Sequence, residues 1–272
     1  MSPTDPPTLF ESQAARYAAA RPRYPQALAE WIGDQAPTPG LLWDAGTGSG
    51  QFASVAAGVF DRVVATDASP AQLARAPEHP SVDYRTEPAE APSLAVGSVD
   101  AISAAAAAHW FDLPAFYAAV YRVARPGAFV ALFSYGTTID EDDDLQAVID
   151  DYIQHTLAPW WSPRLARVAS GYRALPFPFA EVEMPSFSAC SRGDLSALQD
   201  ILRTWSAAQT AALETGRDPV AQVADRLARA WRIRGAEDEP RTLRWPVFGR
   251  AGRVQGTAGV RQGARPARPQ EG

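Results

Sequence analysis

The stretch from Asp44 to Gly50 combines residue types and a spacing that suit ligand binding. It reads Asp-Ala-Gly-Thr-Gly-Ser-Gly and follows an apolar run, so a carboxylate precedes glycines at every second position. Glycine lacks a Cβ, which permits a positive φ and lets a ligand approach the backbone closely. A helical pattern begins at Gln51, and the first turn of a helix offers unpaired N–H groups and the positive end of its dipole. This stretch therefore favours the binding of a nucleotide-like ligand.

The positions of the glycines narrow the class of ligand that this turn could bind. A dinucleotide-binding turn requires Gly-x-Gly-x-x-Gly, and Gln51 occupies its third glycine position here. A carboxylate such as Asp44 at the strand end suits a ligand that carries an ammonium group. A tight strand-to-helix turn with no ligand is the alternative, since a glycine-rich loop alone is a weak signal.

A second carboxylate stands at the separation that doubly wound folds use. Asp67 ends the apolar run that begins at Arg62, and it follows Gly46 by 21 positions (67 − 46). An acidic residue at about that separation accepts hydrogen bonds from ribose hydroxyls. Two features in register predict one binding site better than either does alone.

Two further side chains could act near this site. Glu90 lies in a loop after a predicted strand, where it could accept a hydrogen bond from an adenine amino group, although a solvated loop glutamate is an equal alternative. His109 precedes Trp110 and has an imidazole that titrates near neutrality, so it is the candidate general base. The alternative for His109 is a packing or hydrogen-bonding role beside Trp110.

The segment from Phe10 to Tyr24 has apolar residues at helical spacing and ends before a proline. It is either a lid over the ligand or an amphipathic helix packed on the sheet with solvated arginines. As a lid it would turn its aromatic and basic side chains toward the ligands, with Arg21 or Arg23 holding an anionic substrate by paired hydrogen bonds. The predicted substrate-contacting residues are Tyr17, Arg21, Tyr24 and Trp110.

Elements that would position these residues follow from hydrophobic periodicity. Apolar runs alternate with helical patterns over residues 41–135, which predicts a parallel sheet with right-handed crossovers. The predicted strands of this part are 41–45, 62–67, 81–86, 98–103 and 128–133. The alternation stops after Gly136, where we predict helices over 145–157, 195–213 and 220–233 and strands over 180–187 and 241–248. The acidic run 140–144 is interpreted as a helix start rather than a metal site.

Length, composition and net charge limit the classes of protein to which the chain can belong. The chain has 272 residues, 46% hydrophobic content and a net charge of −6, which favours a globular protein and gives no general attraction to nucleic acid or an anionic membrane. The chain has a single cysteine, Cys190, so no disulfide can form within it. Its three histidines and Cys190 do not have the spacing of metal ligands, so we expect no metal site. We expect a cytoplasmic monomer or homodimer. From Gly249 onward the chain is rich in glycine, proline and arginine, and we expect the folded domain to end at about residue 250 and a disordered tail to follow.

Taken together, the motifs resemble those of a class I S-adenosylmethionine-dependent methyltransferase of the type 11 group. The motifs that carry this resemblance are Asp44–Gly50, Asp67 and residues 98–100, 109–112 and 122–127. The pattern F-x-x-x-A-x-x-Y-x-x-x-R-P-x-Y-P, from Phe10 to Pro25, is similar to the trans-aconitate methyltransferase-like branch, as are 175–179, 204–207 and 245–246. The likeness extends from about residue 10 to residue 250.

The resemblance implies a fold and a cofactor site. It implies an α/β, Rossmann-like sheet of seven mostly parallel strands, with the last antiparallel, helices on both faces, and helical cap insertions at about 137–179 and 188–240. The methionine part of S-adenosylmethionine would face Asp44, Gly46, Thr47 and Gly48, the ribose would face Asp67, and the adenine would face Ala89 and Glu90. Gly50 and Ala68 complete the predicted cofactor-binding set.

The implied activity is methyl transfer to a small molecule, and O-methylation of an organic acid carboxylate is the expected reaction. An apolar or aromatic-lined pocket beside a few arginines would suit such a substrate, with Trp160, Trp161, Phe177, Phe179 and Trp205 as candidates for its walls. A carboxylate needs no base, whereas a hydroxyl, carbon acid or amine would use His109. The alternatives are a C- or O-methyltransferase of a quinone or secondary metabolite, and a cofactor-binding protein without methyl transfer.

Overall fold

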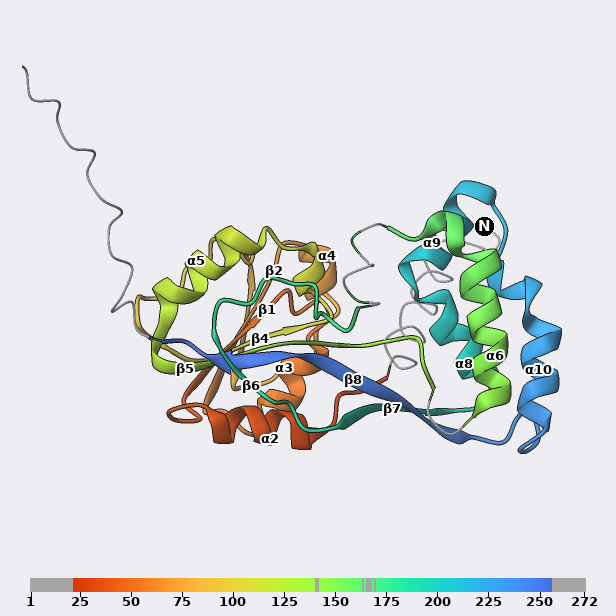
Figure 1. Ribbon diagram of the computed structural model, residues 1–272, viewed down its shortest axis with the longest axis horizontal. Coiled ribbons are helices and arrows are strands. Elements are labelled where there is room, and N and C mark those ends of the chain that lie inside the picture. The colour runs from red at the N-terminus through yellow and green to blue at the C-terminus, as the bar shows by residue number, and fades with distance from the viewer. Residues whose placement is uncertain (1–21, 140–141, 163, 165–167, 169, 256–272) are drawn as a thin grey trace, which may run out of the picture.

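A mixed β-sheet with helices on both faces lies beside a smaller helical lobe (Figure 1). The computed structural model describes residues 22–255 except 140–141, 163, 165–167 and 169. The predicted Tyr17 and Arg21 contacts, most of the predicted lid and the tail from residue 256 therefore lie outside the described residues. No helix within the described ranges is long and apolar enough to cross a bilayer.

The sheet has eight strands in the order β3-β2-β1-β4-β5-β8-β6, and β7 also pairs with β8. β1 to β5 are parallel, and β8 runs antiparallel to β5. The predicted α/β class, with a mostly parallel sheet and an antiparallel last strand, is confirmed. The strands are Leu41–Ala45 (β1), Arg62–Asp67 (β2), Val82–Thr86 (β3), Val99–Ala105 (β4), Ala124–Tyr135 (β5), Ala180–Val182 (β6), Phe187–Gly193 (β7) and Arg241–Arg253 (β8).

One predicted strand is two strands, so the predicted count of seven is wrong. Residues 180–187 divide into β6 and the start of β7, which pair with successive stretches of β8. Pro185 lies between them, and proline has no N–H with which to continue a ladder. The predicted cap at 188–240 is accordingly wrong for its first residues, because the sheet includes the chain through Gly193.

The predicted start of the tail is also wrong, because β8 continues through Arg253. Glycines in this stretch indicated a loop, yet the strand needs them where neighbouring backbones come close. A Cβ on Gly249 would collide with the carbonyl oxygen of Leu132, and one on Gly252 would lie 2.6 Å from that of Ala180. The glycines of this stretch therefore serve close packing between strands, and the disorder predicted from composition does not begin there.

Alternation along the strands divides the core into two layers, one on each face of the sheet. Leu42 and Phe129 pack in the layer that contains helices α2 and α3, whereas Trp43 and Val130 pack in the layer that contains α5. Successive residues of a strand point to opposite faces, which is why both faces need helices. These helices are Gln26–Gln35 (α2), Gln51–Ala56 (α3), Pro70–Leu73 (α4) and Leu113–Val123 (α5).

The helical lobe is built from two segments of the chain, one after β5 and one between β7 and β8 (Figure 1). Asp142 caps its first helix by accepting a hydrogen bond from Leu145 N at 3.1 Å, as a helix start requires. An ion pair between Asp151 and Arg226 joins the first helix to the last. The elements are Asp143–Asp151 (α6), a π-helical turn Tyr152–Thr156 (η2), Ala158–Trp160 (η3), Leu195–Arg203 (α8), Ser206–Thr215 (α9), Pro219–Gln222 (η5) and Ala224–Arg232 (α10).

Candidate active site

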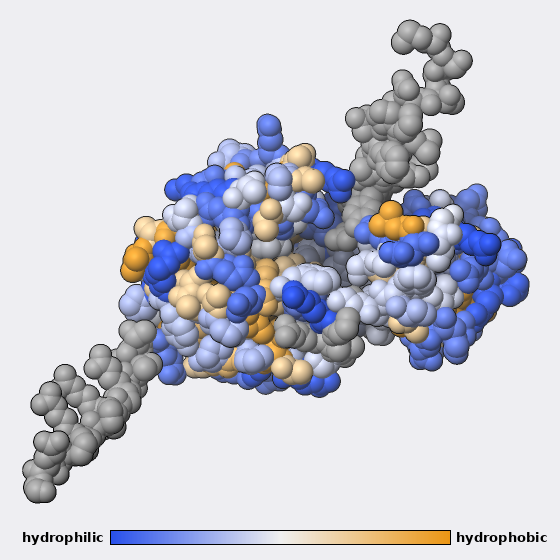
Figure 2. All heavy atoms as spheres, turned by 90° about the horizontal axis from the view of Figure 1, so that it is seen from above, coloured by the Kyte–Doolittle hydropathy of each residue, from blue (hydrophilic) through white to orange (hydrophobic). Residues whose placement is uncertain are grey.

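A cavity of about 2000 Å³ lies between the carboxyl ends of the parallel strands and the helical lobe. Figure 2 shows the two lobes and the hollow between them. In open α/β sheets, ligands bind at the carboxyl ends of the strands. Pockets for one ligand typically measure about 300–1000 Å³, so this cavity has room for a cofactor and a second molecule.

The glycine-rich turn forms one wall of the cavity. Gly46, Gly48 and Gly50 all have positive φ, of 65°, 59° and 74°. A Cβ on Gly46 would lie 2.6 Å from Ala107 Cβ, whereas a Cβ on Gly48 would meet nothing within 4 Å. Gly48 therefore faces open space, as a turn that receives a ligand must. Gly50 begins α3 against Tyr84 and does not line the cavity.

Asp67 lies at the cavity wall and stabilises the same turn. Its Oδ2 accepts a hydrogen bond from Gly48 N at 2.9 Å, and its Oδ1 accepts one from Ser69 N at 2.8 Å. A carboxylate oxygen has two acceptor sites, so both oxygens can still accept from a ligand hydroxyl. This arrangement fits the ribose hydroxyls that the sequence predicts for Asp67.

Asp44 lies beneath the turn and is not among the residues that line the cavity. It is fully buried, and it accepts hydrogen bonds from Thr47 Oγ1 at 2.6 Å and from Ser103 Oγ at 2.7 Å. Burial raises the pKa of this carboxyl from 3.8 to about 6, although both hydrogen bonds oppose the rise. The predicted direct contact of Asp44 with the ligand is thus replaced by support of Thr47, which does line the cavity.

The predicted adenine-binding residues lie at the cavity, together with Ala68. Ala89 is buried, and Glu90 accepts a hydrogen bond from Asp112 N at 2.9 Å through Oε1. One oxygen of Glu90 therefore already holds the loop that follows β4. A cofactor-binding role for these residues stays a prediction.

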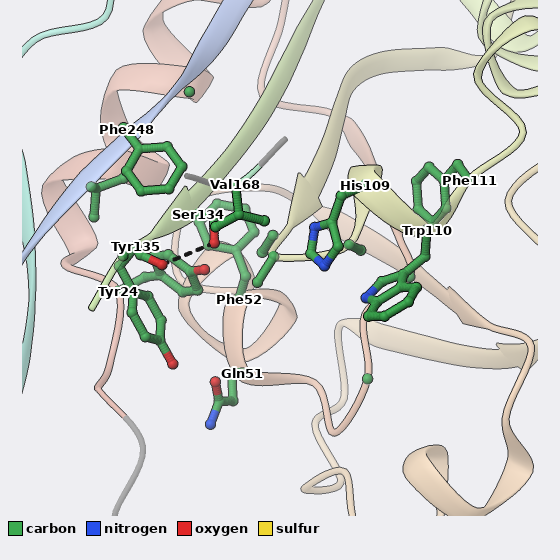
Figure 3. A pocket seen from close by; sticks show the side chains of 18 of the residues that line it. Tyr24, Gln51, Phe52, His109, Trp110, Phe111, Ser134, Tyr135, Val168 and Phe248 are labelled. Atoms are coloured by element: carbon green, nitrogen blue, oxygen red, sulfur yellow. Dashed lines mark hydrogen bonds between the residues drawn. The ribbon is translucent and has the colours of Figure 1, made fainter. Parts of the chain in front are cut away.

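His109 lies in the 3₁₀ turn Ala108–Trp110 (η1), which follows the alanines at the end of β4. Its side chain is 4% exposed, lines the cavity and places Nδ1 2.8 Å from the phenol oxygen of Tyr172. Trp110 is 44% exposed, lines the cavity, and its ring lies 4.9 Å from that of His109 (Figure 3). His109 is thus hydrogen-bonded and also lines the cavity, and its role as a base stays a prediction.

The N-terminal end of the described chain contributes Tyr24 to the cavity wall. This side chain is buried, and its ring packs edge-on against Phe133 at 5.1 Å. Arg23 is exposed, does not line the cavity, and pairs through its backbone with Cys190. The prediction that Arg23 holds a substrate therefore has no support from its position.

The structure adds residues that sequence reasoning missed. Thr137 and Thr138 follow β5 at the cavity, and the rule that loops after parallel strands line the site would have found them. Arg173 and Arg250 also line it. Of the five predicted aromatic wall residues, Trp161 and Trp205 line the cavity, whereas Trp160, Phe177 and Phe179 do not.

Comparisons with known proteins agree with this architecture. A family model described as a methyltransferase domain matches residues 43–132. The chain is 44% identical to a candidate type II methyltransferase from Anaeromyxobacter dehalogenans of known structure, with a TM-score of 0.79, and the match covers 86% of this chain and 98% of that one.

Curated relatives carry the same kind of name. A candidate methyltransferase of Dictyostelium discoideum is 26% identical over 91% of this chain and 97% of its own length. A methyltransferase-like protein of Schizosaccharomyces pombe is 32% identical over 45% of this chain and 50% of its own. With a relative of known structure matched over nearly its whole length, and with the glycine-rich turn of β1 inside the matched domain, the chain belongs to the class I methyltransferase family.

Proposed function

We propose that the protein transfers a methyl group from S-adenosylmethionine to a small molecule. The observation that carries this proposal is the hydrogen bond from Gly48 N to the Asp67 carboxylate, at the wall of a cavity large enough for two ligands. When bound, the cofactor supplies a methyl group on a sulfonium, which is already activated for transfer. The protein then has to bind the donor and the acceptor, orient them, and exclude water from the site.

The residues present fit this cofactor. Gly46 and Gly48 offer bare backbone to its methionine part, and Asp67 offers carboxylate oxygens to its ribose hydroxyls. Ala68, Ala89 and Glu90 also line the cavity and are the proposed contacts of its adenine. Asp44 contributes negative charge from beneath the turn, which favours the cationic ligand over a pyrophosphate.

Orientation is the main contribution that the protein can make. Holding donor and acceptor in line can supply about 7–11 kcal/mol of the barrier. The cavity continues from the glycine-rich turn to the helical lobe, where Trp161 and Trp205 lie with ring centroids 6.2 Å apart. The acceptor would therefore lie between the turn and these aromatic rings.

Two acceptor classes have support in the cavity wall. An organic acid carboxylate, as in the trans-aconitate methyltransferase-like branch, would use Arg173, whose Nε donates to the carbonyl of Ser170 at 3.2 Å. Arg250 is a weaker candidate, because it pairs with Glu181 at 2.6 Å. A quinone or another aromatic metabolite would instead use the rings of Trp161 and Trp205.

Calorimetry and labelled transfer test the proposal in sequence. S-adenosylmethionine and S-adenosylhomocysteine should each bind with micromolar affinity, and NAD should not. Transfer of labelled methyl to a panel of carboxylates, phenols, quinols and amines then identifies the acceptor class. Absence of binding by folded protein would refute the proposal, and tight binding without transfer across the panel would favour a cofactor-binding protein that is not a methyltransferase.

A further inference from the structure

The connection between β3 and β4, residues 87–98, brings Ala89 and Glu90 to the cavity wall. It contains no helix or strand of its own. Connecting loops are more mobile than the elements that they join, so the position of these two residues depends on what holds the loop. Helix α5, which covers one face of the sheet (Figure 1), holds it at both of the helix's ends.

The first attachment is at the start of α5, beside the cavity. Glu90 Oε1 accepts a hydrogen bond from Asp112 N at 2.9 Å. Asp112 is the N-cap residue of α5, and its own side chain accepts from Ala115 N at 3.3 Å. A carboxylate has about four acceptor sites, so Glu90 can accept from Asp112 N and from an amino group of a ligand at the same time.

The second attachment is at the other end of α5, where Arg122 reaches the loop. Its Nη1 donates to the carbonyl oxygen of Leu94 at 2.8 Å, and its Nη2 donates to that of Pro92 at 2.5 Å. A guanidinium can only donate and a carbonyl can only accept, and hydrogen bonds from a charged donor are stronger than neutral ones. Arg122 is exposed and does not line the cavity, so it acts on the loop and not on a ligand.

The spacing of the two attachments matches on the helix and on the loop. Asp112 and Arg122 are ten positions apart (122 − 112), which is about 15 Å along a helix. The chain from Glu90 to Leu94 can span at most about 14 Å. The loop therefore lies alongside α5 and cannot slide along it while both attachments persist. Ala89 and Leu94 are buried in the same apolar layer as α5, so packing supports the same placement.

We infer that Arg122 is a positioning residue for recognition of the cofactor's base, holding the loop from outside the cavity so that Glu90 faces the amino group of adenine. This inference rests on the proposed function. It gives a role to Arg122 in the stretch 122–127, which the sequence showed only as part of a resemblance. Without Arg122 the loop would keep its attachment at Asp112 N, but the chain beyond Glu90 would be free to move away from α5.

Amide hydrogen exchange tests the attachment without any ligand. Arg122→Met keeps the apolar stem of the side chain and removes both donors. The amides of residues 88–95 should exchange about 10-fold faster in this variant than in wild type. Arg125→Met is the matched control, because Arg125 is also exposed but pairs with Asp100 at 2.8 Å, and Asp100 holds Leu41 N at the edge of the sheet opposite the cavity. Its loop should exchange at the wild-type rate.

Discrimination between two bases separates positioning from general stability. Calorimetry compares S-adenosylhomocysteine with S-inosylhomocysteine, whose base has a carbonyl in place of the adenine amino group. Wild type should prefer adenine by about 10-fold, and Arg122→Met should lose most of this preference. A general loss of stability lowers both affinities by the same factor and leaves their ratio unchanged. Arg122→Lys should keep part of the preference, because an ammonium can still donate to one of the carbonyls, and Arg125→Met should keep all of it.

The outcomes that would overturn the inference are specific. They are loop exchange in Arg122→Met at the wild-type rate, a preference for adenine that Arg122→Met retains in full, and an equal loss of that preference in Arg125→Met. Equal binding of the two bases by wild type would also overturn it, because Glu90 would then not read the amino group. If folded wild type binds neither compound, the proposed function is refuted, and the exchange measurement still decides whether Arg122 holds the loop.

Discussion

Asp67 Oδ2 accepts a hydrogen bond from Gly48 N at 2.9 Å, across 19 residues of sequence. This bond joins the end of β2 to the turn after β1, so the group expected to bind ribose also fixes the backbone expected to face the methionine part. Ser69 N donates to the other carboxylate oxygen at 2.8 Å. Changes at Asp67 should therefore affect both halves of a bound cofactor.

Asp67→Asn should raise the Kd for S-adenosylhomocysteine about 10- to 100-fold. An amide presents one acceptor oxygen, so it cannot satisfy both backbone donors, and hydrogen bonds to a charged group are worth about 1.5–3 kcal/mol. Asp61→Asn is the control, because Asp61 is exposed and lies just before the opposite end of β2. Calorimetry gives both affinities. Equal affinities of Asp67→Asn and wild type would contradict the expected ribose contact.

Alanine substitutions in the turn should separate backbone strain from ligand contact. Gly48→Ala and Gly97→Ala both place alanine at positive φ, of 59° and 62°, with nothing within 4 Å of the new Cβ. Each should lower the free energy of unfolding by about 1–2 kcal/mol, but only Gly48→Ala should weaken cofactor binding, by more than 10-fold. Urea denaturation and calorimetry measure the two effects. Equal binding by both variants would show that the ligand does not approach Gly48.

Gly46→Ala should behave differently from Gly48→Ala. Its new Cβ would lie 2.6 Å from Ala107 Cβ and 2.9 Å from the Phe111 ring, at a φ of 65°. Strain and overpacking together should destabilise the protein by about 2–5 kcal/mol. A melting temperature close to that of Gly48→Ala would indicate that η1 moves away easily.

Stability should depend on pH through Asp44. Its pKa is about 6 in the folded protein and 3.8 without the fold, so the folded state retains the proton longer than the unfolded state. Its contribution to the free energy of unfolding is therefore fully present below about pH 4 and is lost as pH rises through 6, by about 3 kcal/mol at most. Asp44→Asn removes this dependence, so wild type should lose stability relative to it between pH 4 and 7. Urea denaturation at several pH values measures this, with Asp34→Asn as an exposed control. A constant difference across that range would exclude the shift.

Substitutions on the lobe side of the cavity should weaken binding of the acceptor and leave binding of the cofactor unchanged. Trp161→Leu should raise KM for the acceptor about 10-fold and leave the Kd for S-adenosylhomocysteine unchanged, because Trp161 lines the cavity near Trp205. Trp160→Leu changes the adjacent indole, which does not line the cavity. Steady-state kinetics with the acceptor found by labelled transfer compare the two. Similar KM values for both variants would remove Trp161 from the acceptor site.

Local patterns predicted several of the residues that line the cavity at the ends of β1 and β2. The glycines after β1 and the carboxylate after β2 are short-range signals, because a parallel sheet brings the ends of neighbouring strands together. Asp44 shows the limit of such reasoning. Its position in the sequence was informative, but whether its carboxylate faces the cavity or the core depends on Thr47 and Ser103, and Ser103 comes from another strand.

Tyr172 could not have been predicted as a partner of His109. The two residues are 63 positions apart, and Tyr172 lies in a stretch without hydrophobic periodicity, where its positive φ contradicts its residue type. The prediction of where β8 ends was wrong for the opposite reason. There the local composition was clear, but the close approach of Leu132 and Ala180 decides the structure.

Gly193 and Arg241 are register partners where β7 and β8 diverge. Topologically, everything between them is one long hairpin loop, although it folds into α8, α9, η5 and α10. Such an excursion can be lengthened, shortened or exchanged without reordering any strand. Because this excursion carries Trp205 at the cavity wall, its exchange would alter the proposed acceptor side while the strand ends around Gly48 and Asp67 keep their arrangement.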